Sequence, residues 1–171
     1  MQESKKHWIS RLAIGALCGL ASSSSFTTPA APAAHAAQSL CAANEPVVFA
    51  CHVGSKLVSL CRPPGDRGML SYRFGRPEAL ELSYPEPGRQ ARAAFTVKSA
   101  PLVGGGETTV AFQRGAYTYT VYSRVGRGED GATPAFEDGL IVSRRGKVLS
   151  RMRCEDGGEG FREPVDGVAV K

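Results

Sequence analysis

The stretch that decides the fold is ETTVAFQRGAYTYTVYS, residues 107–123. β-Branched and aromatic residues alternate with polar ones on both sides of Arg114-Gly115, and the glycine suits a tight turn. This pattern predicts two antiparallel strands, residues 107–113 and 116–123, joined as a hairpin. A period of two places Tyr117 and Tyr119 on one face of the sheet and Tyr122 on the other.

Similar short strands are predicted on both sides of this hairpin. Upstream they are residues 46–52, 56–61, 69–74, 79–84 and 94–98, and downstream residues 139–143 and 147–154. Turns rich in glycine and proline separate them, and a long polar loop is expected from about Arg124 to Asp138. About eight strands without helical periodicity predict an all-β domain, a single small antiparallel barrel or sandwich.

The first 36 residues have the composition of a secretory signal. Lys5, Lys6 and Arg11 precede the apolar run LAIGALCGL, and small residues then lead to Ala34-His35-Ala36. This order of basic, apolar and small-residue segments is typical of a cleaved signal peptide. The apolar run is less than half of the ~20 residues that a membrane-spanning helix needs, so no transmembrane anchor is expected.

The chain is therefore expected to divide into a signal peptide and one exported domain. The predicted parts are the signal peptide over residues 1–36, a disulfide-stapled β domain over 37–154, and a glycine- and acid-rich tail, expected to fray, over 155–171. The predicted location is the periplasm or the extracellular medium. Cleavage would remove three basic residues and one acid and lower the formal net charge from +5 to +3. So mild and scattered a charge argues against a nucleic-acid surface.

Four cysteines follow the predicted cleavage site: Cys41, Cys51, Cys61 and Cys154. An even number in a small exported domain indicates two disulfides, for which three pairings exist. In the hairpin of residues 46–61, Cys51 lies near the turn and Cys61 at the open end, too far apart to be bonded to each other. Cys41 precedes the hairpin and can reach its open end more easily than its turn. The pattern favours Cys41–Cys61 with Cys51–Cys154 over the remaining alternative.

Residues that could support catalysis are few. His52 is the one histidine after residue 36 and falls at a predicted turn, and no G-x-S-x-G sequence is present. Glu78, Glu81 and Glu107 could contribute to the carboxylate pair of a glycosidase, but glutamates on the polar faces of strands are ordinary. We therefore predict a protein without catalytic residues, metal site or cofactor, and keep carboxylate chemistry as an alternative.

Two patterns that contain glycine are interpreted as turns or bends. Glu-Asp-Gly occurs at residues 129–131, 137–139 and 155–157, without the alternating acids of a calcium loop. Gly104, Gly105 and Gly106 lack the Lys-Ser/Thr pair and the helix of a phosphate loop, which favours a flexible or sharply bent segment.

The densest aromatic feature is the set of Tyr117, Tyr119 and Tyr122, which Arg114 and Arg124 bracket. Tyrosine and arginine are enriched where proteins bind one another. Ordinary packing in the core of a sheet is the alternative for these tyrosines. The candidate partner-binding residues are these five together with Gly104, Gly105, Gly106 and Glu107.

The opening of the domain, Phe49-x-Cys51-x-x-Gly54-x-x-Leu57-Val58, resembles the first strand pair of the periplasmic inhibitors of c-type lysozyme. Those proteins are small exported β-barrels, and the late Cys154 and the mid-chain glycines are similar in layout. Residues 99–107 (SAPLVGGGE) take the place of the family's inhibitory loop but lack its Ser-x-Gly-x-x-Tyr signature, so no inhibitory residue is carried over. The chain also resembles many small exported proteins of Gram-negative bacteria, a likeness that implies no activity.

The sequence thus predicts a non-enzymatic exported binding protein whose partner is another protein. The resemblance implies that this partner is a cell-wall hydrolase, which the chain would inhibit. Two alternatives stay open: an enzyme or carrier that acts on envelope polysaccharide through carboxylates, and a purely structural envelope protein. No nucleic acid is expected as a partner, and the sequence does not define the oligomeric state.

Overall fold

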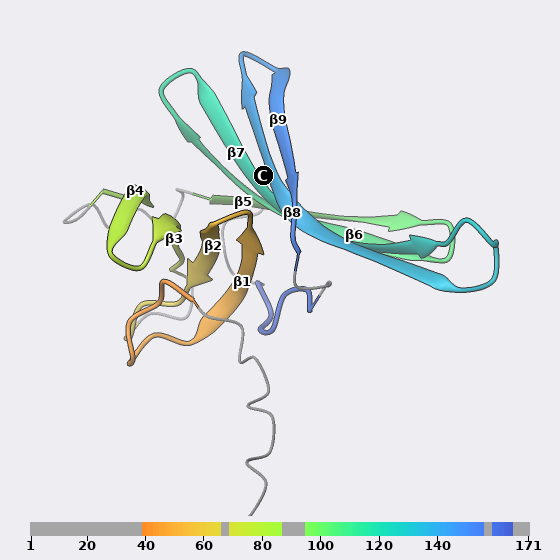
Figure 1. Ribbon diagram of the computed structural model, residues 1–171, viewed down its shortest axis with the longest axis horizontal. Coiled ribbons are helices and arrows are strands. Elements are labelled where there is room, and N and C mark those ends of the chain that lie inside the picture. Colours follow the sequence, from red (N-terminus) through yellow and green to blue (C-terminus); the bar gives the residue numbers. More distant parts are fainter. Residues whose placement is uncertain (1–38, 66–68, 87–94, 156–158, 166–171) are drawn as a thin grey trace, which may run out of the picture. The chain divides into compact units, whose positions relative to one another are not determined.

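The computed structural model describes residues 39–65, 69–86, 95–155 and 159–165, so the expected signal peptide lies outside it. These ranges contain nine β-strands in two antiparallel sheets and no helix long and apolar enough to cross a bilayer (Figure 1). The first sheet consists of β1 (Val47–Val53), β2 (Lys56–Cys61), β3 (Ser71–Arg76) and β4 (Ala79–Tyr84). The second consists of β5 (Phe95–Leu102), β6 (Gly105–Arg114), β7 (Tyr117–Arg127), β8 (Pro134–Arg144) and β9 (Lys147–Arg153).

Each sheet is a meander in which every strand pairs with the next one along the chain. The prediction of an all-β, disulfide-bonded domain is therefore confirmed. Of the two predicted architectures, the barrel is excluded, because the two sheets do not close into one. The order of strands within each sheet follows from short turns such as Gly54-Ser55, where Gly54 has a φ of +61°.

Aromatic side chains from both sheets form the core between them. Tyr72 of β3 lies 4.8 Å from Phe112 of β6 between ring centroids, and Tyr84 of β4 stacks on Phe112 at 4.3 Å. Phe95 and Tyr119 pack against the same Phe112 ring, at 5.5 and 5.0 Å. Because such rings bury large apolar areas, this cluster helps to hold the two sheets together.

Two disulfides have the predicted pairing. Cys41 is bonded to Cys61 and Cys51 to Cys154, with Cα–Cα distances of 5.4 and 5.5 Å. The second bond joins β1 of the first sheet to the end of β9 in the second. The adjacent backbone continues this connection, because the Glu155 amide donates to the carbonyl of His52 at 3.0 Å.

Residues 159–165 belong to the segment expected to fray, and they lie against β1. Phe161 contacts Phe49 with ring centroids 5.4 Å apart, and the Arg162 amide donates to the carbonyl of Val48 at 2.9 Å. Val165 is buried within the core. The apolar positions that produce this contact, Phe161 and Val165, are separated by charged residues, which hides them in a composition-based analysis.

The prediction of a long polar loop between residues 124 and 138 was wrong. β7 continues to Arg127 and β8 begins at Pro134, which leaves a connection of residues 128–133 only. The turn expected at residues 137–139 was also wrong, because this segment lies inside β8. A Cβ on Gly139 would lie 2.7 Å from the Tyr122 hydroxyl, so the glycine makes room for a neighbouring tyrosine instead of turning the chain.

The glycine break expected at residues 104–106 is smaller than predicted. Val103 and Gly104 alone form the turn, whereas Gly105 and Gly106 are paired in β6. A Cβ on Gly105 would lie 2.3 Å from the carbonyl oxygen of Val125, so the strands approach closely there. The β3–β4 pairing is irregular beside Leu80, which is 51% exposed, whereas Leu82 of the same strand is buried.

Candidate functional site

The second sheet has two ends with different chemistry. At one end lie the β5–β6 turn and the β7–β8 connection, and we call this the loop end (Figure 1). At the other lie the β6–β7 turn, Gly115-Ala116, and the β8–β9 turn, Arg145-Gly146, and we call this the basic end. The candidate site at the loop end is described first.

The face of the second sheet that is buried in the core becomes exposed towards the loop end. Pairing across β5–β8 places Val97, Val110, Val121 and Leu140 in one buried row. The next row on the same face is polar and consists of Ser99, Thr108, Ser123 and Asp138. The row after it consists of Pro101, Gly106, Val125 and Phe136, and Phe136 is 65% exposed. An apolar row is thus presented to solvent at the loop end.

A groove lies on this face, between the sheet and residues 159–161. Its volume is about 450 Å³, and its lining includes Thr108, Ser123, Val125 and Phe136 from the sheet and Phe161 from the other side. The Gly160 amide donates to Asp138 Oδ2 at 2.8 Å, which holds this side in place. The groove therefore combines apolar side chains with hydroxyl groups and with the charged residues Arg124 and Glu159, as many binding sites do.

The turn at the loop end exposes two more apolar side chains. Leu102 is 41% exposed and Val103 is 72% exposed. Beside them, the Asp130 carboxylate accepts hydrogen bonds from the hydroxyl and amide of Thr133 and from the amide of Ala132, which lower the pKa of Asp130 to about 2. The connection is thus ordered by its own hydrogen bonds. The β5–β6 turn, which carries Leu102 and Val103, is joined to β7 by the Arg127 amide, which donates to the carbonyl of Val103 at 3.1 Å.

The opposite face of the second sheet carries a polar network centred on Glu137. Tyr122 is fully buried and donates its hydroxyl to Glu137 Oε1 at 2.7 Å, while Arg124 contacts Glu137 Oε2 at 2.8 Å. Burial raises the pKa of Glu137, but the hydrogen bonds from Tyr122 and Arg124 and the nearby charge of Arg153 outweigh it, and the pKa is lowered. Burial, followed by the hydrogen bond to Glu137, raises the pKa of Tyr122. The network holds Glu137 ionised and Tyr122 protonated.

The structure divides the predicted partner-binding residues between the two ends. Gly104, Gly105, Gly106, Glu107 and Arg124 come together at the loop end, where Glu107 pairs with Arg124 across β6 and β7. Arg114 and Tyr117 face each other at the basic end.

Two of the predicted tyrosines are occupied by packing. Tyr119 stacks on Phe112 in the core, and Tyr122 is buried in the polar network. The two faces predicted for the tyrosines are confirmed by the pairing of β6 with β7.

Sequence reasoning missed the apolar residues that the loop end exposes. Leu102 and Val103 stood beside the glycines, and Phe136 was assigned to a polar loop. The one signal past the predicted strand end is Val125, an apolar residue between Arg124 and Gly126. It was masked because polar and apolar residues mix on both faces.

Two of the three carboxylates considered for catalysis are held in ion pairs. Glu81 contacts Lys56 at 2.8 Å and Glu78 contacts Arg76 at 3.8 Å. Among the described carboxyl groups, Glu45, Asp130 and Glu137 have a shifted pKa, and each shift is downward. Within the described ranges, no three His, Cys, Asp or Glu residues gather as a metal site.

No protein-family model, curated protein or solved structure matches this chain.

Proposed function

We propose that this chain is a non-enzymatic exported binding protein that engages a protein partner through the loop end of its second sheet. The observation that carries the proposal is the solvent exposure of Leu102, Val103 and Phe136 beside a groove of about 450 Å³. Exposed apolar side chains grouped beside a groove with a polar rim mark an interaction site. The backbone of Val103 accepts a hydrogen bond from the Arg127 amide and Phe136 is paired with Val125, so these side chains are presented at little cost in conformational entropy, which favours tight binding.

Export is the second part of the proposal. It is supported by the order of segments in residues 1–36 and by the two disulfides, which form and persist in oxidising compartments. N-terminal sequencing of the protein recovered from an exporting host tests it, with Ala37 expected as the first residue. Recovery of a protein that starts at Met1 from the cytoplasm would contradict it.

A cell-wall hydrolase is the partner class proposed first, because the projecting turn at Leu102-Val103 suits insertion into a substrate cleft and because of the resemblance of residues 49–58. The exported protein is added to turbidity assays with a panel of c-, g- and i-type lysozymes. Stoichiometric inhibition of one type is expected. A complete lack of inhibition across the panel would contradict the hydrolase assignment.

Matched variants locate the binding surface. L102S/V103S is expected to weaken inhibition about 10- to 30-fold, since truncation of an interface hot spot costs about 1–2 kcal/mol or more. L80S is the control, because Leu80 is similarly exposed but lies on β4 of the first sheet. Equal losses in both variants would contradict a site at the loop end. Bond cleavage in envelope polysaccharide that E81Q or E107Q abolishes, with folding intact, would favour the carboxylate enzyme instead.

A further inference from the structure

The basic end of the second sheet lacks acidic residues. Residues 139–153 contain Arg144, Arg145, Lys147, Arg151 and Arg153 and no Asp or Glu. Residues 108–123 of the neighbouring strands contain Arg114 and likewise no acid. The acids of this sheet, Glu107, Glu129, Asp130, Glu137 and Asp138, all lie towards the loop end. The sheet is therefore electrically polarised along its strands, although the chain as a whole carries only a mild charge.

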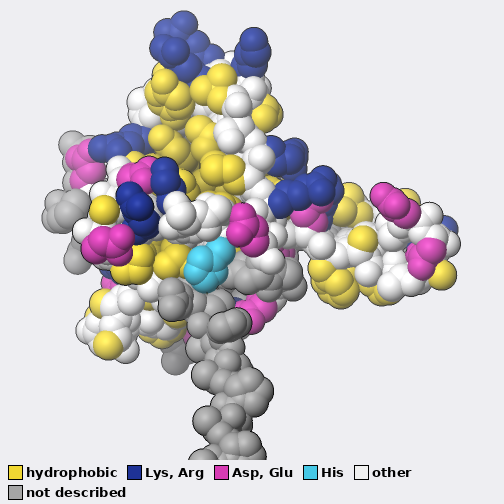
Figure 2. Space-filling model, in the orientation of Figure 1, with side chains coloured by type: hydrophobic (Ala, Val, Ile, Leu, Met, Phe, Trp, Pro, Cys, Tyr) yellow, Lys and Arg dark blue, Asp and Glu magenta, His cyan; other side chains and the backbone are white. Residues whose placement is uncertain are grey.

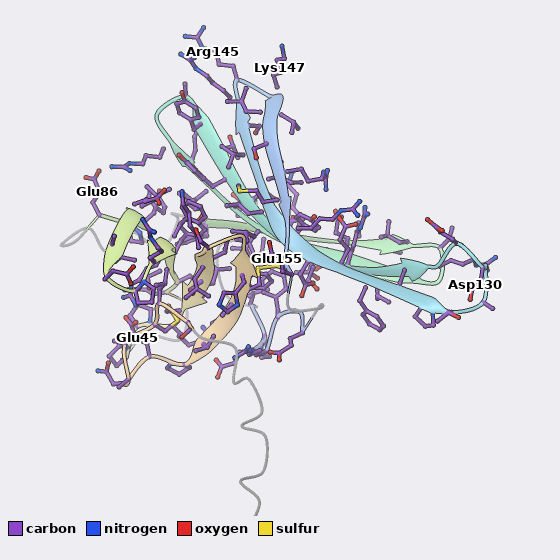
Figure 3. The ribbon with its side chains drawn as sticks, viewed as in Figure 1. Glu45, Glu86, Asp130, Arg145, Lys147 and Glu155 are labelled. Atoms are coloured by element: carbon purple, nitrogen blue, oxygen red, sulfur yellow. A yellow bond between two sulfur atoms is a disulfide. The ribbon has the colours of Figure 1, made fainter. Side chains whose placement is uncertain are left out.

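Four residues form a row across the basic end. Strand pairing sets Arg114 opposite Tyr117, Tyr117 opposite Arg144, and Arg144 opposite Lys147. Paired residues of adjacent strands point to the same face, so these three cations and the tyrosine share one side of the sheet. The Arg144 guanidinium lies 5.5 Å from the centre of the Tyr117 ring, and Arg114 contacts Glu86 at 3.5 Å. Arg145 extends from the turn itself (Figure 3).

Exposed apolar side chains adjoin these cations. Val148 and Leu149 follow Lys147 directly and are 54% and 55% exposed, and Tyr117 is 37% exposed. Figure 2 shows the basic side chains gathered at this end of the sheet, with hydrophobic side chains directly beneath them. We call Arg114, Arg144, Arg145 and Lys147 the basic tip, and Val148 and Leu149 the apolar pair.

Arg145 occupies its position at a conformational cost. Its φ is +48°, in the left-handed region that glycine and asparagine adopt readily and arginine does not. Gly146, with a φ of +79°, completes a two-residue turn of the type that prefers Asn-Gly. Strained residues concentrate at functional sites. A cation is thus held at the outermost point of the hairpin where the turn itself favours a neutral residue.

We propose that the basic tip and the apolar pair form a docking surface for an anionic phospholipid membrane. Cations bind the phosphate headgroups, and each contributes about a fivefold gain in affinity near such a surface. Val148 and Leu149 lie behind the tip, so they are buried at the membrane interface when the hairpin lies along the bilayer surface. This mode needs no shape complementarity, and therefore suits the narrow tip of a two-residue turn.

An acidic protein is less well matched to this surface. Stable protein interfaces bury about 800 Å² on each partner and have an apolar core surrounded by polar residues. Here the cations lie at the outermost point and the apolar pair adjoins them on one strand. The proposal is independent of the loop end, so either one can fail without the other.

The test measures binding of the protein, in the form that an exporting host accumulates, to sedimenting vesicles. One set contains phosphatidylcholine with phosphatidylglycerol and the other phosphatidylcholine alone. The variants are R145N/K147Q for the tip and V148S/L149S for the apolar pair. The control is R76Q/K98Q, which removes two exposed cations from outside the tip. Binding to soluble polyglutamate is measured in parallel.

The expected result is binding to the anionic vesicles alone, weakened by added salt. R145N/K147Q should lower the partition coefficient about 25-fold, given about fivefold per cation, and V148S/L149S should lower it as well. R76Q/K98Q should lower it less than fivefold. The lack of binding by the unaltered protein would overturn the proposal, and so would equal losses in the tip and control variants. Tip-dependent binding of polyglutamate that matches or exceeds vesicle binding would assign the surface to an acidic protein instead.

Discussion

Among the described ion pairs, the one between Arg73 and Glu45 is the least exposed, with side chains 19% and 9% accessible. Arg73 of β3 donates to both carboxylate oxygens of Glu45 and to the carbonyl of Leu40. The pair therefore fixes the segment that precedes β1 onto the first sheet. Such two-point arginine–carboxylate contacts are stronger than single hydrogen bonds between neutral groups.

This pair makes stability depend on pH. The hydrogen bonds from Arg73, joined by the Ala42 amide, lower the pKa of Glu45 below its ordinary value of 4.5, although burial opposes them. The unfolded chain therefore takes up this proton at a higher pH than the folded one. The stabilisation is complete well above pH 4.5 and is lost as the pH falls through the folded pKa. We expect E45Q to lower the free energy of unfolding by about 2 kcal/mol at pH 7 and by less at pH 3, measured by urea titration.

The control for this prediction is E81Q. Glu81 forms an ion pair with Lys56 in which both side chains are more than a third exposed, so the variant should cost less than about 1 kcal/mol. An effect of E45Q that is equal at pH 7 and pH 3 would show that the carboxylate charge is not what stabilises the fold.

Tyr72 lies at the centre of the aromatic core with its side chain fully buried. Its hydroxyl has no hydrogen-bond partner within the described part of the chain. Burial, with a smaller contribution from the neighbouring Tyr119, raises its pKa well above the ordinary value. Removal of an unsatisfied buried hydroxyl relieves its desolvation cost. We expect Y72F to raise the free energy of unfolding by up to about 1 kcal/mol in guanidinium titrations, and Y84F to change it little. A loss of more than about 1 kcal/mol in Y72F would reveal a partner for the hydroxyl.

Single residues were predictable where the chemistry is local. The cysteine pairing followed from the position of Cys51 near a turn and of Cys61 at the open end of the same hairpin, and the structure confirms it. Gly139 was misassigned because its role is to accommodate Tyr122 from the adjacent strand. The sequence around Gly139 does not reveal a contact with a residue on the adjacent strand.

At the scale of elements, the β8–β9 turn allows a direct test of backbone strain. R145N should raise the free energy of unfolding by about 0.5–1 kcal/mol, because asparagine adopts the left-handed conformation at lower cost. The measurement is thermal unfolding followed by circular dichroism. R144N is the control, because Arg144 lies within β8, and no gain is expected there. Equal effects of the two variants would show that the backbone of the turn is unstrained. A more stable R145N/K147Q that binds anionic vesicles poorly would also separate docking from folding.

Strand ends were the least predictable elements. β5 runs to Leu102, β7 runs to Arg127 and β8 begins at Pro134, all beyond the expected limits. Alternation of polar and apolar residues fades there because both faces leave the core. These strand ends are held by backbone pairing with one another, such as that of Val125 with Phe136. The loop end, which is the candidate site, lies in this region of weak sequence signal.

At the scale of the whole molecule, the two sheets are held together by the aromatic core and by Cys51–Cys154. The sequence predicted a sandwich or barrel and could not choose between them. That choice depends on whether the edge strands of separate meanders pair, and no local pattern records it. The Cys51–Cys154 bond closes a separation of 103 residues, whereas Cys41–Cys61 closes one of 20 within the first sheet.

The two disulfides should therefore differ in their contributions to stability. Loop-closure entropy predicts about 4.7 kcal/mol for the long bridge and about 3.3 kcal/mol for the short one. We expect C51A/C154A to lower the free energy of unfolding more than C41A/C61A does, with urea titration of both oxidised variants as the measurement. The difference should exceed the entropic value, because of the two bridges only the long one ties β1 to the second sheet. If C41A/C61A is the less stable variant, attachment of the segment before β1 through Leu40, Glu45 and Arg73 contributes more to folding than the connection between the sheets.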